Sequence, residues 1–201
     1  MRIIAGKHKN RIIPSLKNSN YRPSTTKFRE ALFSILSSGE FVENPPCEGA
    51  NILDLFAGTG SLSFEALSRG AKTITLLDND KDHLKVAKDF AVKIGEEDNV
   101  KFLLASAISL PFAAEQYSLV FMDPPYYNQF VEKSLISLIK NRWLKNKAII
   151  VVEMEKREEF TMPENVSLVK EKIYGNNQLL ILRYEQEYKT ICLCCLRKYQ
   201  R

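Results

Sequence analysis

The chain has 201 residues, of which 45% are hydrophobic and 26% are charged. These are ordinary values for a globular protein, and the length allows one α/β domain plus an appendage. No apolar stretch approaches the roughly 18 residues of a membrane-spanning helix, and no signal peptide opens the chain, so we expect a cytoplasmic protein with no membrane association. The four cysteines (Cys47, Cys192, Cys194 and Cys195) are too few and too clustered for a disulfide framework and indicate a reducing compartment.

The net charge of +5 is unevenly distributed along the chain. Residues 1–30 contain eight Lys or Arg and one acidic residue, whereas residues 31–182 contain 16 basic and 21 acidic residues. A basic arm on an acidic body predicts a polyanionic partner such as nucleic acid, the alternative being a solvated basic surface. The candidate phosphate contacts are Arg2, Lys7, Lys9, Arg11, Arg22, Lys27 and Arg29.

Residues 1–45 are predicted to form a basic extension. Two β-branched runs, 2–5 and 11–14, predict a small hairpin with Lys7, His8 and Lys9 at an exposed tip. We expect His8 to face solvent rather than to act as a catalyst.

A helix and a linker follow this hairpin. Ser24, Thr25 and Thr26 are good N-cap residues for a helix that runs to about Ser37. Residues 39–49, which include two adjacent prolines, are predicted to link the extension to the main domain at 46–184.

From Asn51 onward the pattern alternates between strand and helix, which predicts a largely parallel sheet in an α/β fold. The expected strands are 52–55, 73–77, 100–104, 118–122 and 148–152, and the expected helices are 61–69, 81–94 and 129–141. Residues 166–173 and 179–184 predict a closing antiparallel hairpin.

A glycine turn follows the first of these strands, in the sequence Asp-Leu-Phe-Ala-Gly-Thr-Gly at 54–60. A buried strand that leads through glycines into a helix N-terminus is typical of nucleotide binding. A dinucleotide site would need a third glycine where this chain has Ser63, and Asp54 would repel a pyrophosphate but suits an ammonium group. Asp78 ends the next strand, near the spacing of ribose-binding acids. The pattern therefore predicts S-adenosylmethionine, contacted by Asp54, the 56–60 turn with Phe56, Ala57, Gly58 and Gly60, and Asp78 with Asn79.

A second motif, Asp123-Pro124-Pro125-Tyr126, follows another apolar strand. The Asp123 carboxylate and the Pro124 carbonyl could accept hydrogen bonds from an aromatic amine and direct its lone pair towards a methyl donor. Prolines remove competing backbone donors, and the Tyr126 ring offers a face for base stacking. These four residues are the candidate catalytic group.

Other chemistries fit the sequence less well. Carbon methylation of a pyrimidine would need a cysteine nucleophile, but Cys47 precedes the glycine turn in the linker. The cysteines of the tail, 185–201, lack metal-ligand spacing, so we expect no metal site and assign that segment no function.

The motifs resemble those of class I methyltransferases that act on exocyclic amines. With Arg-Ile-Ile-Ala-Gly at 2–6 and the Arg-Pro-Ser-Thr-Thr and Arg-Glu-Ala-Leu-Phe-Ser-Ile-Leu segments within 22–36, residues 1 to about 184 resemble the RsmD family of bacterial 16S rRNA guanine-N2 methyltransferases. The resemblance implies a Rossmann-like, seven-stranded sheet, an N-terminal hairpin-and-helix extension, and 16S rRNA in a small-subunit particle as substrate. We expect the protein to be a monomer. It also implies that Asp78 holds the ribose and that the 105–107 turn, with Ser106 and Ala107, lies at the adenine. Ser106 stands where such enzymes usually have Asp or Asn.

Two other functions remain open on the sequence alone. A DNA adenine-N6 methyltransferase could use the same Asp-Pro-Pro-Tyr motif, although the chain lacks a large target-recognition domain. A non-catalytic RNA-binding factor on this scaffold is the second alternative, and the intact site residues Asp54, Gly58, Gly60, Asp78 and Asp123 argue against it.

Overall fold

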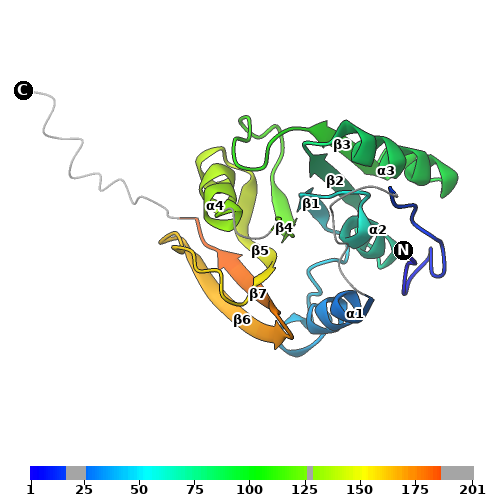
Figure 1. Ribbon diagram of the computed structural model, residues 1–201. Coiled ribbons are helices and arrows are strands. Elements are labelled where there is room, and N and C mark those ends of the chain that lie inside the picture. The colour runs from blue at the N-terminus through cyan, green and yellow to red at the C-terminus, as the bar shows by residue number, and fades with distance from the viewer. Residues whose placement is uncertain (17–25, 126–128, 187–201) are drawn as a thin grey trace, which may run out of the picture.

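A seven-stranded sheet forms the centre of the computed structural model, which describes residues 1–16, 26–125 and 129–186 (Figure 1). The strands are β1 (Asn51–Leu55), β2 (Thr73–Asp78), β3 (Val100–Leu104), β4 (Tyr117–Met122), β5 (Leu144–Glu155), β6 (Val166–Tyr174) and β7 (Asn177–Tyr184). Their order is β3-β2-β1-β4-β5-β7-β6, with the first five parallel and the β6–β7 hairpin antiparallel. The predicted α/β fold and its closing hairpin are confirmed.

Helices cover both faces of this sheet. They are α1 (Thr26–Ile35), α2 (Ser61–Ser68), α3 (Lys81–Lys93) and α4 (Phe130–Lys140), with short 3₁₀ turns at Gly39–Phe41 and Glu97–Asn99. Buried residues of α1, α2 and α3 belong to one hydrophobic cluster, whose sheet face we call the α2 face. Buried residues of α4 belong to a second cluster, whose sheet face we call the α4 face. Alternate residues of each central strand point to opposite faces and so join the two layers.

The N-terminal extension shares the core of the main domain. Ile3, Ile13 and Phe33 belong to the same hydrophobic cluster as Ile52 of β1 and Phe121 of β4. The predicted linker contributes buried Phe41 and Cys47 to this cluster, so it packs as part of the molecule.

Three elements of the structure differ in extent from their sequence-based predictions. The segments 2–5 and 11–14 are joined by one antiparallel bridge, between Arg2 and Ile12, and form no regular strands. Helix α1 ends at Ile35, and its predicted N-caps Ser24 and Thr25 lie outside the described residues. Strand β5 is longer than 148–152, because β7 pairs with it as far as Glu155.

Over the parts of the chain that the structure describes, none of the helices has the length and apolar character needed to cross a membrane.

Candidate active site

The two sequence motifs meet at one edge of the sheet. Leu55 of β1 lies opposite Leu77 of β2 and opposite Met122 of β4. The glycine turn follows Leu55, Asp78 follows Leu77, and Asp123 follows Met122. These features therefore lie at the same level on three adjacent strands. Ligands of open α/β sheets bind at this carboxyl edge.

Backbone geometry shapes the glycine turn. Phe56 has a left-handed φ of 64°, which is uncommon for a bulky residue, and its ring stacks on Phe130 at the start of α4 with centroids 5.8 Å apart. Gly60 precedes α2 with a φ of 84°, and a Cβ there would meet Leu76 and Phe64 side-chain atoms at 2.6 and 2.8 Å. Gly60 is therefore required by the core beneath the turn as well as by backbone conformation.

Asp78 fastens this turn to β2. Its Oδ2 accepts a hydrogen bond from the Gly58 backbone N–H at 2.7 Å, and its Oδ1 accepts one from the Asp80 N–H at 2.8 Å. A carboxylate has about four lone-pair positions, so acceptor capacity remains for hydroxyl groups of a ribose. Asn79 is exposed beside it. The remaining acceptor capacity of the Asp78 carboxylate thus fits the predicted sugar contact.

Asp54 lies deeper and is only 2% exposed. The Ser63 hydroxyl of α2 donates to its Oδ2 at 2.6 Å. Burial is the main reason that the pKa of Asp54 rises to about 7, with the Ser63 hydrogen bond opposing the rise and the charge of Asp78 adding to it. A buried acid at a helix N-terminus would be ionised most readily beside a cation, which fits the ammonium of an amino-acid tail.

The segment after β3 lies at the same edge of the sheet. The Ala105 N–H donates to the Asp78 carbonyl at 3.1 Å, which ties this segment to β2. Ser106 is exposed and Ala107 is buried in the α4-face cluster.

Asp123 and Pro124 are buried and Pro125 is exposed, directly after β4. The exposed fraction of Asp123 is 8%. Tyr126, the fourth predicted catalytic residue, lies outside the described residues.

The candidate RNA contacts differ widely in their exposure. Arg2, Lys9, Arg11 and Lys27 are exposed, and Arg22 lies outside the described residues. Arg29 has no exposed surface, so its prediction as a phosphate contact is wrong. Its Nη1 lies 3.9 Å from Glu65 Oε2 of α2, and its Nη2 donates to the Arg2 carbonyl at 3.0 Å. The N-terminal segment therefore covers the side of α1 that carries Arg29.

Glu65 anchors the N-terminal segment to α2. The Ile4 and Ala5 backbone N–H groups donate to its two carboxylate oxygens at 2.7 and 3.1 Å, and Arg69 Nε donates to it at 2.7 Å. An acid inside the otherwise small and apolar helix of residues 61–68 was the available sequence signal for this role, and it was missed.

A second acid holds the tip of the same segment. Glu96 Oε1 lies 2.6 Å from both Lys7 Nζ and His8 Nε2, and Glu96 is only 6% exposed. The prediction of a solvent-facing His8 is therefore wrong, because His8 packs against the residues after α3. The Lys7 N–H also donates to the Ser68 carbonyl at the end of α2, and Gly6 lies so close to Ser68 that a Cβ there would clash. Figure 1 shows this segment in blue beside α2 and α3.

The tip lies away from Asp123. In a βα unit the helix runs back against its strand, so the ends of α2 and α3 are at the amino edge of the sheet. The tip residues Lys7 and His8 are therefore at the edge opposite to Asp123.

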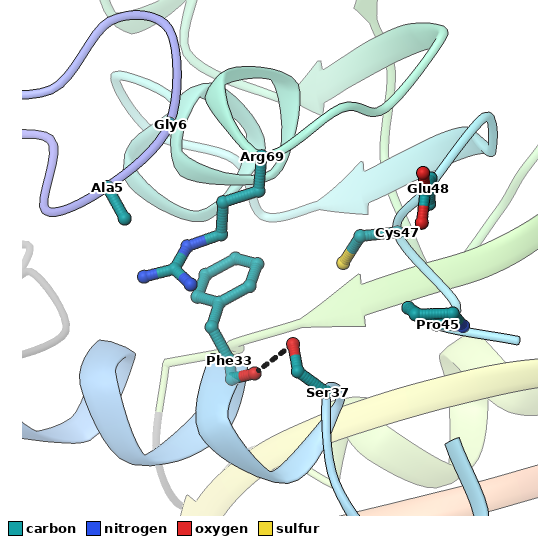
Figure 2. Close-up of a pocket in the computed structure, with 8 residues that line it drawn as sticks. All are labelled: Ala5, Gly6, Phe33, Ser37, Pro45, Cys47, Glu48 and Arg69. Atoms are coloured by element: carbon teal, nitrogen blue, oxygen red, sulfur yellow. Dashed lines mark hydrogen bonds between the residues drawn. The ribbon is translucent and has the colours of Figure 1, made fainter. Parts of the chain in front are cut away.

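A pocket of about 330 Å³ lies at this amino edge, between the N-terminal segment, α1, the predicted linker and α2 (Figure 2). The Arg69 guanidinium lies over the Phe33 ring, 4.8 Å from its centroid. Cys47 lines the pocket, and burial raises the pKa of its thiol to about 12. A thiol so hard to ionise is a poor nucleophile, and it is remote from the carboxyl edge.

Within the described ranges, no three His, Cys, Asp or Glu side chains gather in a way that could hold a metal ion.

Comparison with known proteins places this architecture in a family. Residues 1–183 match the family model described as "Conserved hypothetical protein 95". The chain belongs to this family, the RsmD family. One relative of this RsmD-family chain is the "Uncharacterized methylase RP545" of Rickettsia prowazekii, 40% identical over 94% of this chain and 100% of that protein. Another is the "Ribosomal RNA small subunit methyltransferase D" of Escherichia coli K12, 35% identical over 93% and 90% of the two chains.

Solved structures show the same fold. The yhhF protein of Escherichia coli superposes with a TM-score of 0.81 at 31% identity, covering 93% of this chain and 99% of that one. An RNA methyltransferase from Salinibacter ruber, solved with S-adenosyl-L-homocysteine, has a TM-score of 0.59 at 13% identity over 84% and 97% of the chains, which shows a shared class I methyltransferase fold.

Proposed function

We propose that this protein transfers a methyl group from S-adenosylmethionine to the exocyclic N2 amine of a guanine in 16S rRNA, within a small-subunit particle. The observation that carries the proposal is the meeting of the glycine turn, Asp78 and Asp123 at one sheet edge. Relatives named as small-subunit rRNA methyltransferases support the RNA substrate.

The residues of the edge divide between cofactor and substrate. When bound, the cofactor supplies an electrophilic methyl group on a sulfonium. Asp54 would hold the ammonium of its amino-acid end, Asp78 would accept hydrogen bonds from its ribose hydroxyls, and residues 105–107 would border its adenine.

Asp123 and Pro124 hold the amine. The Asp123 carboxylate and the Pro124 carbonyl accept the two N–H groups of the guanine N2 amine and fix its lone pair towards the methyl group. The guanine amine is a weak nucleophile because its lone pair is delocalised into the ring, so alignment and polarisation account for most of the required catalysis. Asp123 forms no covalent bond in this mechanism.

The exposed basic residues of the extension hold the RNA. Arg2, Lys9, Arg11 and Lys27 contact phosphates, and Lys7 does so in competition with Glu96.

The test is single-turnover methylation of small-subunit particles that lack the modification, with nucleoside analysis of the product. Asp123→Ala should leave cofactor affinity near the wild-type value and slow methylation roughly ten- to a hundredfold or more, since one charge-assisted hydrogen bond is worth about 1.5–3 kcal/mol. Tyr126→Ala should also impair turnover, whereas Tyr126→Phe should be mild because stacking needs only the ring.

Asp98→Ala, an exposed acid at the opposite edge, is the matched control and should methylate normally. A wild-type rate for Asp123→Ala would reject the mechanism. Methyl transfer from labelled cofactor to DNA adenine rather than to RNA would reject the substrate, and absence of transfer to either would favour a non-catalytic factor.

A further inference from the structure

Strand β5 places another acid beside Asp123. Met122 of β4 lies opposite Val152 of β5 in parallel register, so the next residues, Asp123 and Glu153, are neighbours across adjacent strands. Each follows by two positions a residue of the α2-face cluster, Phe121 and Val151. Side chains two residues apart point to the same face of a sheet, so Glu153 lies on the α2 face. Asp123, the first residue after β4, continues the same alternation beside it, on a strand about 4.8 Å away.

Glu153 is held in place by the closing hairpin. It is 5% exposed, and the Asn177 amide at the start of β7 donates to its Oε1 at 2.9 Å. Strands β5 and β7 remain paired as far as Glu155 and Asn177, so they extend beyond the end of β4. This end of β5 therefore lies beside the Asp-Pro-Pro segment.

We propose that Glu153 is the residue that selects guanine, by accepting the N1–H of the base whose N2 amine Asp123 holds; this rests on the proposed function. The Watson–Crick edge of guanine presents N1–H and N2–H donors side by side, which matches two carboxylates on adjacent strands. Adenine carries a lone pair at N1, which a carboxylate repels. An enzyme that takes a base into a pocket reads it through this edge.

The experiment compares two target bases in each variant. Small-subunit particles are reconstituted with 16S rRNA that carries either guanosine or 2-aminopurine riboside at the methylated position. 2-Aminopurine keeps the reactive N2 amine but has an acceptor at N1. Wild-type protein should prefer guanosine, and Glu153→Gln should reduce that preference about tenfold, mainly by slowing the guanosine reaction, since a neutral acceptor replaces a charged one.

The preference is a ratio measured within one variant, so the fraction of folded protein cancels. Asn177→Ala leaves the Glu153 carboxylate but removes its orienting hydrogen bond, and it should reduce the same ratio by a smaller factor. Glu115→Gln, at the amino edge where Glu115 pairs with Lys101 at 2.6 Å, should keep the wild-type ratio. Cofactor affinity should be unchanged in all three variants.

The outcomes separate the two proposals. If wild-type protein methylates no guanine N2 in the particles, the proposed function fails. If it does so and Glu153→Gln keeps the wild-type ratio, only the assignment of Glu153 is overturned.

Discussion

Asp54 is a single residue whose charge changes near neutral pH. Its pKa in the folded protein is about 7, against an ordinary value of 3.8, so between these values the folded state holds a proton that the unfolded state has released. Without cofactor, this residue's contribution to stability therefore decreases as pH rises from about 4 to about 7 and is constant above that window. A bound ammonium would instead favour the ionised form of Asp54, because it interacts with the carboxylate charge.

This coupling predicts a pH-dependent cofactor affinity. Below pH 7, binding of S-adenosylhomocysteine should weaken by up to about tenfold per pH unit, since only the ionised fraction of Asp54 is competent, and it should level off above the pKa. Calorimetry between pH 5 and 7 measures the slope. Asp54→Asn should bind more weakly with little slope, whereas an equal slope in that variant would exclude Asp54 as its source.

Asp78 serves both the turn and the predicted ribose contact. Asp78→Ala removes the acceptor for the Gly58 N–H together with the hydroxyl contacts, so cofactor affinity should fall about tenfold or more, each charged hydrogen bond being worth roughly 1.5–3 kcal/mol. Calorimetry compares the cofactor affinity of this variant with that of Asp89→Ala, which removes an exposed acid on α3 and serves as the control. Unchanged binding in Asp78→Ala would reject the assignment.

Among the elements, a buried charge pair joins α1 to α2, and its Glu65 carboxylate also accepts the Ile4 and Ala5 backbone N–H groups of the N-terminal segment. Burial lowers the pKa of Arg29, with the charge of Glu65 opposing the shift, and neither side chain is exposed. Glu65→Ala would leave this guanidinium without its carboxylate, so the free energy of unfolding should fall by about 3–5 kcal/mol. Urea denaturation measures this loss of unfolding free energy. Glu48→Ala, at an exposed position, should change stability by less than about 0.5 kcal/mol, and a similarly small effect at Glu65 would contradict the anchoring role.

The elements of the fold also show which parts of the structure the sequence could predict. Strands β1, β2, β3 and β4 and helices α2 and α3 were predictable because their apolar periodicity is local and their ends carry glycines or caps. The meeting of the glycine turn, Asp78 and Asp123 was predictable from parallel topology, which brings strand ends together. Burial of Arg29 was not, because the segment that covers it is distant in sequence. The neighbourhood of Asp123 and Glu153 depends on strand register, which no local pattern specifies.

Across the whole molecule, RNA affinity should depend on salt through the exposed basic residues. Replacing Lys9, Arg11 and Lys27 together by alanine should flatten the slope of log affinity against log salt by about 0.7–0.9 for each phosphate that the variant no longer binds. Lys7→Ala alone should flatten it less, because Lys7 is paired with Glu96. Filter binding to 16S rRNA over a salt series measures the slopes. The control variant, Lys145→Ala with Lys147→Ala, removes exposed cations from the start of β5, and an equal flattening there would show that the effect is one of net charge alone.

The position of the N-terminal tip has a consequence for substrate size. The tip and Asp123 lie at opposite edges of a sheet whose β2 strand has six residues, a separation of roughly 20 Å at about 3.3 Å per residue. If the tip and Asp123 both contact RNA as proposed, an RNA that reaches both places is bound at two points, and binding at the second benefits from the high effective concentration that the first creates. An RNA fragment that contacts only the tip or only Asp123 would lose this avidity, which increases affinity by roughly 10²–10⁴-fold. The protein would then distinguish its target by the distance between two parts of a folded RNA, in addition to the identity of one base.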